Sequence, residues 1–67
     1  METHPEKFLR LPQVKSLTGL GRTRIYRKIS EDKFPRPVRL GPQSVAWVES
    51  EVLEWMQQRI LERDEPA

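Results

Sequence analysis

Residues 17–29 carry the sequence LTGLGRTRIYRKI, in which two glycines separate an apolar segment from a basic one. Gly19 suits the left-handed backbone conformation that ends a helix, and only Leu20 and Gly21 remain to form a tight turn. A second helix is therefore expected to start at once. Two helices joined by about three residues form a helix-turn-helix, and Leu20 is the expected apolar plug between them.

The segment before this turn predicts the first helix of the pair. Pro12 fits the first helical turn, where its missing N–H costs no hydrogen bond. Val14 and Leu17 follow at a three-residue spacing and are expected to share the buried face. This helix is therefore short and ends at Gly19.

The second helix is expected to cover residues 22–31 and to present a basic side to solvent. At about 100° per residue, Ile25 and Ile29 lie close together and turn inward. The opposite side holds Thr23, Arg24 and Arg27, with Tyr26 and Lys28 at its flanks. These five residues and Arg22, at the start of the helix, are its candidate DNA-binding residues. Arginine can bond to both major-groove acceptors of guanine, and a major groove about 12 Å wide admits one helix. A merely solvated charged face is the alternative interpretation.

Prolines at positions 35 and 37 prevent a helix after the basic segment, because each restricts the residue before it and removes a backbone donor. We expect two short strands, 38–40 and 45–47, joined into a hairpin by the turn 41–44. The polar residues of this hairpin are candidates for contacts with phosphate or a neighbouring minor groove, namely Arg36, Arg39, Gln43 and Ser44. A plain turn that covers the core is the alternative.

A third helix is expected from Ser50, as its N-cap, to about Arg63. Its apolar stripe should face the core and consists of Val52, Trp55, Met56 and Ile60, with Leu53 beside it. Trp47 ends a strand and Trp55 lies on this stripe, so both are interpreted as core residues rather than as platforms for base stacking.

Charge is divided unevenly along the chain, although the net charge is only +2. Residues 8–47 hold nine bases against two acids, a net charge of +7, whereas residues 48–67 hold two bases against six acids, a net charge of −4. A basic front joined to an acidic back presents one face to a polyanion. The partner predicted from charge is therefore a nucleic acid.

Several classes of protein are not supported by the composition. The chain has no cysteine, a single histidine at position 4 and no glycine-rich phosphate loop, so we expect no enzyme activity, no metal and no cofactor. It lacks a long apolar run and a secretory signal, which favours a cytoplasmic location. We expect a flexible N-terminus (1–7), one domain (8–63) and a flexible tail (64–67).

These motifs, taken together, resemble the AlpA family of small phage-type transcriptional regulators. The resemblance covers residues 8–60 and is carried by FLRL at 8–11, TGL at 18–20, IYR at 25–27, FPRPV at 34–38 and the segment from Trp47 to Trp55. It implies a mainly α fold with a small β-hairpin: a winged helix-turn-helix, similar to MerR regulators and excisionases, with three helices and a two-stranded wing. It also implies that Thr23, Arg24 and Arg27 read the major groove. Gly21 departs from the family, in which a serine often precedes the second helix.

The expected function is sequence-specific binding of double-stranded DNA by a regulator encoded on a prophage or another mobile element. One alternative is an excisionase-like factor that bends DNA and recruits an integrase. The other is a protein-interaction module or antirepressor that acts through the C-terminal helix. RNA polymerase or an integrase is the expected protein partner, and a homodimer or cooperative assembly on DNA is expected because one such domain buries little surface on DNA.

Overall fold

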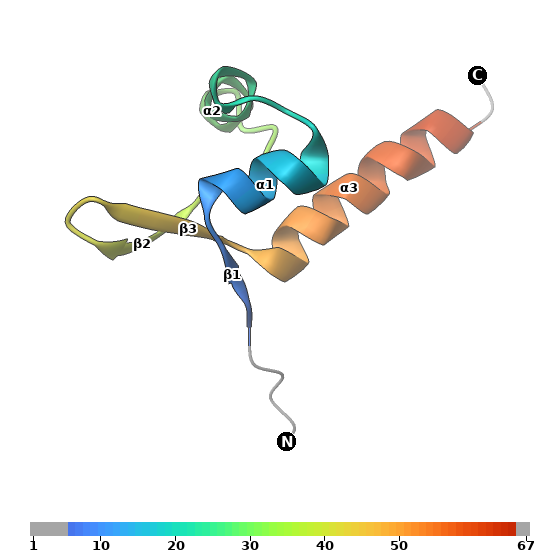
Figure 1. Ribbon diagram of the computed structural model, residues 1–67. Helices are drawn as coiled ribbons and strands as arrows, with labels where there is room; N and C mark the ends of the chain where they lie inside the picture. Colours follow the sequence, from blue (N-terminus) through green and yellow to red (C-terminus); the bar gives the residue numbers. More distant parts are fainter. Residues whose placement is uncertain (1–5, 66–67) are drawn as a thin grey trace.

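The computed structural model describes residues 6–65 as three helices around a small antiparallel sheet (Figure 1). The elements are β1 (Phe8–Leu9), α1 (Leu11–Thr18), α2 (Arg22–Ser30), β2 (Val38–Gly41), β3 (Ser44–Val48) and α3 (Glu49–Asp64). The mainly helical fold is the predicted winged helix-turn-helix. The β2–β3 hairpin extends on one side of the molecule and α3 on the other (Figure 1). Residues 1–5 and 66–67, on which the expected flexible ends largely fall, lie outside the described residues.

The turn between α1 and α2 has the predicted geometry. Gly19 adopts a left-handed conformation, with a φ of 75°, and its amide donates to the Lys15 carbonyl at 2.8 Å. Gly21 is the extended N-cap of α2. The hydroxyl of Thr18 donates to the Val14 carbonyl and accepts from the amide of Leu20. The bond from Gly19 satisfies the carbonyl of Lys15, one of the groups that a helix end otherwise leaves without partners.

The inward face of α1 differs from the prediction. Leu17, expected to be buried, is 39% exposed. The face that meets the sheet instead carries Leu11, Val14 and Thr18, of which Val14 is fully buried and the other two are half-buried. Their spacing of three and then four residues keeps them on one side of the helix, whereas Leu17 lies roughly 90° away from the centre of that side.

The expected two-stranded wing is present as β2 and β3, and β1 adds a third strand, so that the sheet has the order β1-β3-β2. β1 pairs antiparallel with β3, with Phe8 opposite Val48 and Leu9 opposite Trp47. Two residues are too few to show the alternation by which a strand is found in a sequence. β1 is a strand because it pairs with the edge of β3 that β2 leaves free. On the other edge, β2 pairs with β3 and has an irregularity between Arg39 and Gly41.

The core of the described region is small and apolar. Seven side chains are buried: Leu9, Val14, Ile25, Phe34, Ala46, Trp47 and Val52. The indole Nε1 of Trp47 donates to the carbonyl of Pro35 at 3.1 Å, so its polar atom is satisfied inside the core. Trp55 is half-buried, and its indole Nε1 donates to the carbonyl of Lys33 at 2.8 Å. Both tryptophans therefore pack in the core as predicted.

The third helix begins earlier and covers less of the core than expected. α3 starts at Glu49 with Val48 as its N-cap, rather than with Ser50 in that role. Ile60, expected on the buried stripe, is 40% exposed, because the outer half of α3 projects beyond the body of the molecule (Figure 1). Among residues 6–65, no helix is both long enough and apolar enough to cross a membrane.

Replacement of Trp47 by alanine is expected to unfold the domain. Removal of a fully buried tryptophan costs about 3–5 kcal/mol, and a core in a chain this short supplies about the same amount. Leu61→Ala, at a position that is 47% exposed, is the control and should change the free energy of unfolding by less than about 0.5 kcal/mol. Urea unfolding followed by far-ultraviolet circular dichroism measures both. A folded Trp47→Ala variant of unchanged stability would contradict the described core.

Candidate nucleic-acid interface

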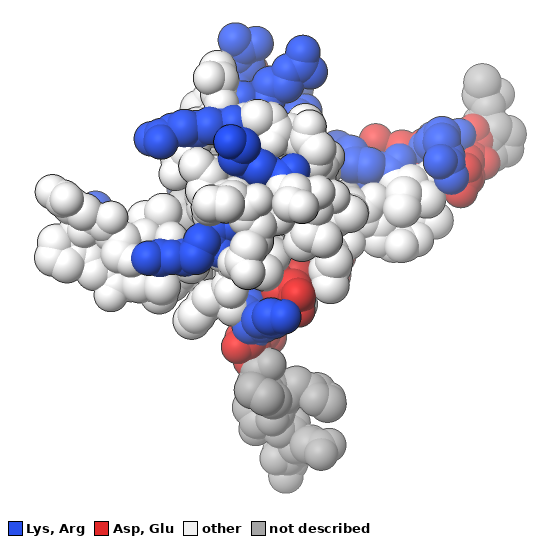
Figure 2. Space-filling view, viewed as in Figure 1, with Lys and Arg blue, Asp and Glu red and all other residues white. Residues whose placement is uncertain are grey.

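The rotation of α2 is set by its apolar residues. Ile25 is fully buried and Ile29 is half-buried against the same core, as predicted. This burial turns Thr23, Arg24 and Arg27 into solvent. Lys and Arg side chains gather over α2 in the space-filling view, whereas the acidic side chains in that view lie along the outer part of α3 and on the lower side of the molecule (Figure 2). We call Thr23, Arg24, Arg27 and Lys28 the basic face.

The basic face is compact and carries uncompensated positive charge. Arg24, Arg27 and Lys28 line one shallow depression of about 240 Å³ together with Glu31. Within residues 6–65, no carboxylate oxygen lies within 4.0 Å of the side-chain nitrogens of these three bases, and Glu31 instead lies 3.9 Å from the ammonium of Lys33. Like charges held together without counterions from the chain itself create a positive potential that attracts a polyanion.

The start of α2 presents further donors. Arg22 lies over the ring of Tyr26, with its guanidinium carbon 5.6 Å from the ring centroid. Tyr26 in turn meets Trp47 edge to face, at 6.1 Å between ring centroids. The N-cap of α2, Gly21, makes no side-chain cap, and the first turn has no acidic residue. The backbone N–H groups of this first turn therefore have no side-chain cap, an arrangement suited to an anion.

The hairpin brings some of the predicted wing residues together. Arg39 is exposed on β2, and Gln43 is exposed in the turn between β2 and β3. Ser44 is half-buried, and its hydroxyl is already engaged: the Nη1 of Arg10 donates to the Ser44 Oγ at 2.8 Å and to the carbonyl of Val45 at 2.9 Å. Arg10 therefore ties the hairpin to the start of α1.

Sequence reasoning assigned no role to Arg10. Its bond to Ser44 spans 34 residues of sequence, and such a distance leaves no periodic or local signal. The local feature that does mark Arg10 is its place as the N-cap of α1, where its amide donates to the Gln13 side chain at 2.8 Å. The N-cap position holds the backbone of Arg10 next to β3, and its side chain can therefore reach the hairpin.

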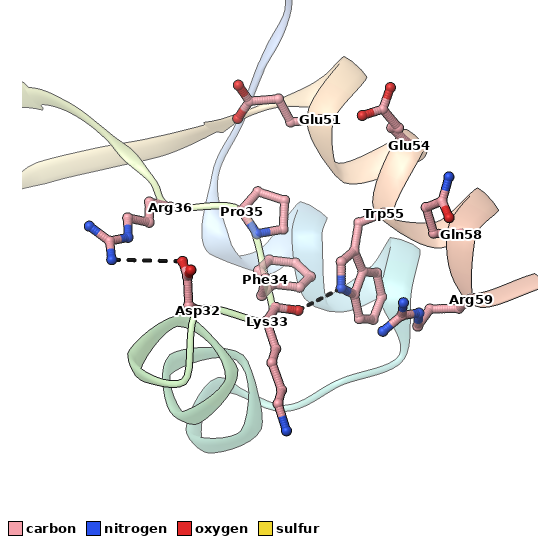
Figure 3. Close-up of a pocket in the computed structure, with 10 residues that line it drawn as sticks. All are labelled: Asp32, Lys33, Phe34, Pro35, Arg36, Glu51, Glu54, Trp55, Gln58 and Arg59. Carbon is pink, nitrogen blue, oxygen red and sulfur yellow. Dashed lines mark hydrogen bonds and ion pairs between the residues drawn. The ribbon is translucent and has the colours of Figure 1, made fainter. Parts of the chain in front are cut away.

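Arg36 lies apart from the hairpin tip. It precedes β2, at the base of the hairpin, and its guanidinium lies 3.8 Å from the Asp32 carboxylate (Figure 3). It also lines a cleft of about 770 Å³, whose other walls include Glu51, Glu54 and Trp55 of α3 (Figure 3). These carboxylates would repel phosphate. The structure therefore groups Arg36 with the acidic side of the molecule rather than with the basic face.

The model of the family described as "Prophage CP4-57 regulatory protein (AlpA)" matches residues 7–60, which include every element from β1 to the middle of α3. The chain belongs to the AlpA family. The resemblance found in its motifs is thus confirmed, and the family match covers both the basic face and the hairpin.

Two relatives of this AlpA-family chain are informative. It is 50% identical over 58 residues to the uncharacterized protein ORF88 of Enterobacteria phage P4, which covers 87% of the chain and 66% of that protein. The chain thus spans just under two thirds of the length of the phage protein. It is 39% identical over 59 residues to the DNA-binding transcriptional activator AlpA of Escherichia coli K12, which covers 79% of the chain and 84% of that protein.

Loss of the Arg10 side chain should loosen the hairpin. Arg10→Met removes two charge-assisted hydrogen bonds, and we expect a local loss of about 1 kcal/mol, equivalent to roughly fivefold faster amide exchange over residues 38–45. Arg39→Met is the matched control, because this exposed arginine makes no such bond among the described residues and its loss should leave exchange unchanged. Hydrogen exchange read by NMR measures both, and equal rates in the two variants would show that Arg10 does not hold the hairpin.

Proposed function

We propose that this protein is a transcriptional regulator that binds double-stranded DNA in a sequence-specific manner, with α2 in the major groove and the hairpin turn on the flanking DNA. The observation that carries the proposal is the basic face: arginines on one exposed side of a helix whose opposite side is anchored by Ile25. A helix fixed in this way can enter a groove without losing the contacts that hold it on the domain.

Each residue of the interface has a role suited to its chemistry. Arg24 and Arg27 present forked donors that fit the paired acceptors of guanine, and the Thr23 methyl and hydroxyl suit a thymine methyl or a phosphate. Lys28, at the edge of the basic face, and Tyr26, beside that face, are placed for contacts with the phosphate backbone that position the helix. Arg39 and Gln43 extend the contact to the DNA beside the site.

The relatives support both parts of this proposal. The Escherichia coli K12 relative is named as a DNA-binding transcriptional activator, and the family match covers the whole helix-turn-helix. The phage P4 relative supports an origin of this chain on a prophage or another mobile element. The protein acts in this proposal by binding alone, and RNA polymerase is the partner through which transcription changes.

An excisionase-like role is the alternative that uses the same interface. Such a factor bends a recombination site and recruits an integrase, so the two roles differ in what happens to the DNA. Three measurements distinguish them: the gel mobility of permuted duplexes that carry the selected site, which reports bending, the yield of excision, and transcription from a nearby promoter. Strong bending together with stimulated excision supports the recombination role, whereas changed transcription from a nearby promoter without an integrase supports the regulator.

The basic face should determine DNA affinity. The first step is selection of bound duplexes from random DNA, followed by titration of the selected site. Arg24→Ala and Arg27→Ala are each expected to weaken binding by about 1–3 kcal/mol if the side chain contacts a base, and a lost phosphate contact should reduce the slope of log K against log salt by about 0.9.

Arg63→Ala is the matched control for these variants. It removes the same charge from the far end of α3, where Arg63 lies 2.9 Å from Asp64, and should leave both the affinity and the salt slope unchanged. Absence of binding by the unaltered protein at low salt would refute the proposed function. Equal losses in all three arginine variants would show that net charge, rather than the basic face, controls binding.

A further inference from the structure

The outer half of α3 is exposed to solvent. Every residue from 57 to 65 is exposed, and the helix projects from the body on the side away from the hairpin (Figure 1). Three large apolar side chains on α3 are left in solvent: Leu53 is 45% exposed, Ile60 is 40% and Leu61 is 47%. A helical segment this short is marginal in water without a surface to pack on.

The exposed Leu53 and Ile60 form an ordered seam together with Met56, which lies between them and is half-buried against the core. Leu53, Met56 and Ile60 follow one another at spacings of three and four residues, which is the pattern by which two helices interlock. Leu53 and Ile60 lie within about 20° of each other around the helix axis, and Leu53 lies about 100° from the buried Val52. We call Leu53, Met56, Gln57 and Ile60 the outer stripe; it lies beside the buried face of α3, and all of its residues except the half-buried Met56 are exposed.

We propose that a second copy of this chain packs on the outer stripe, so that two α3 helices associate in antiparallel orientation. The seam is self-complementary, because its midpoint falls between Met56 and Gln57 and places Leu53 of one copy opposite Ile60 of the other. The pairing does not depend on the DNA-binding role proposed above. For a DNA-binding protein, it joins two basic faces in one assembly.

The charges of α3 favour this occupant and this orientation. The first half of the helix, 49–56, holds Glu49, Glu51 and Glu54 and no base, whereas both bases of α3, Arg59 and Arg63, lie in the second half. An antiparallel pair sets the acidic half of each copy beside the arginine-bearing half of the other, and the two helix dipoles then attract. A parallel pair sets carboxylates beside carboxylates.

The outer half also meets a second copy without net repulsion. Arg59 pairs with Glu62, and Arg63 lies 2.9 Å from Asp64, so the segment 57–64 has no net charge. The basic face, which would repel its own copy, lies on α2 and not on α3. A seam of two helical turns buries less than the roughly 800 Å² per partner of a standard interface, so the pair is weak in solution and gains strength when two copies occupy one DNA.

Single cysteines test the pairing directly, because the chain has none of its own. We compare Gln57→Cys, at the centre of the proposed seam, with Gln58→Cys, the adjacent glutamine, which lines the cleft on another side of α3 (Figure 3). Asp64→Cys reports orientation: in the antiparallel pair the two residue-64 positions lie about 20 Å apart along the axis, but they adjoin in a parallel pair. Each full-length variant is treated, without DNA, with a short bis-maleimide, and the rate of dimer formation is followed.

We expect Gln57→Cys to cross-link at least tenfold faster than Gln58→Cys, and Asp64→Cys to cross-link no faster than Gln58→Cys. Adding Ile60→Glu to the Gln57→Cys variant should abolish the difference, with unchanged circular dichroism showing that the domain stays folded. Equal rates for the two glutamine positions would refute the proposal, and faster reaction of Asp64→Cys would refute the antiparallel orientation. None of these outcomes depends on DNA binding, which the titrations above measure separately.

Discussion

The buried indole of Trp47 is the contact on which the rest of the structure depends. It lies in β3 opposite Leu9 of β1, donates a hydrogen bond to Pro35 before β2, and meets Tyr26 of α2 edge to face. One side chain thus holds the sheet, the connection before the hairpin and the helix with the basic face at fixed positions. In a domain with so small a core, the geometry of any DNA interface depends on this packing.

The proposed function follows from the way this small core places basic and acidic residues on different parts of the surface. Ile25 points into the core, so the arginines on either side of it in sequence are forced outward on α2. Arg10 ties the hairpin to the start of α1 through Ser44, so the hairpin turn is linked to the helices of the proposed interface. The acidic residues lie mainly on α3, the helix on which we propose that a second copy packs.

The features that sequence could predict are those with local causes. Gly19 as a left-handed helix end and Ile25 as an inward residue follow from backbone preference and helical periodicity. Phe34 was missed as a core residue because it stands among prolines without a period, and β1 was missed because two residues show no alternation. The role of Arg10 depends on a contact 34 residues away, which only the folded chain creates. The DNA-binding roles of the site residues stay predictions.

The most direct test of the account is an NMR map of backbone amide shifts as a short duplex of random sequence is added at low salt to the full chain. The account predicts that the largest changes occur at residues 22–28 of α2 and at the hairpin turn, with small changes along residues 57–64. Changes concentrated on the outer half of α3, or around the cleft beside Trp55, would contradict it, because the basic face on α2 would then not be the surface that meets DNA.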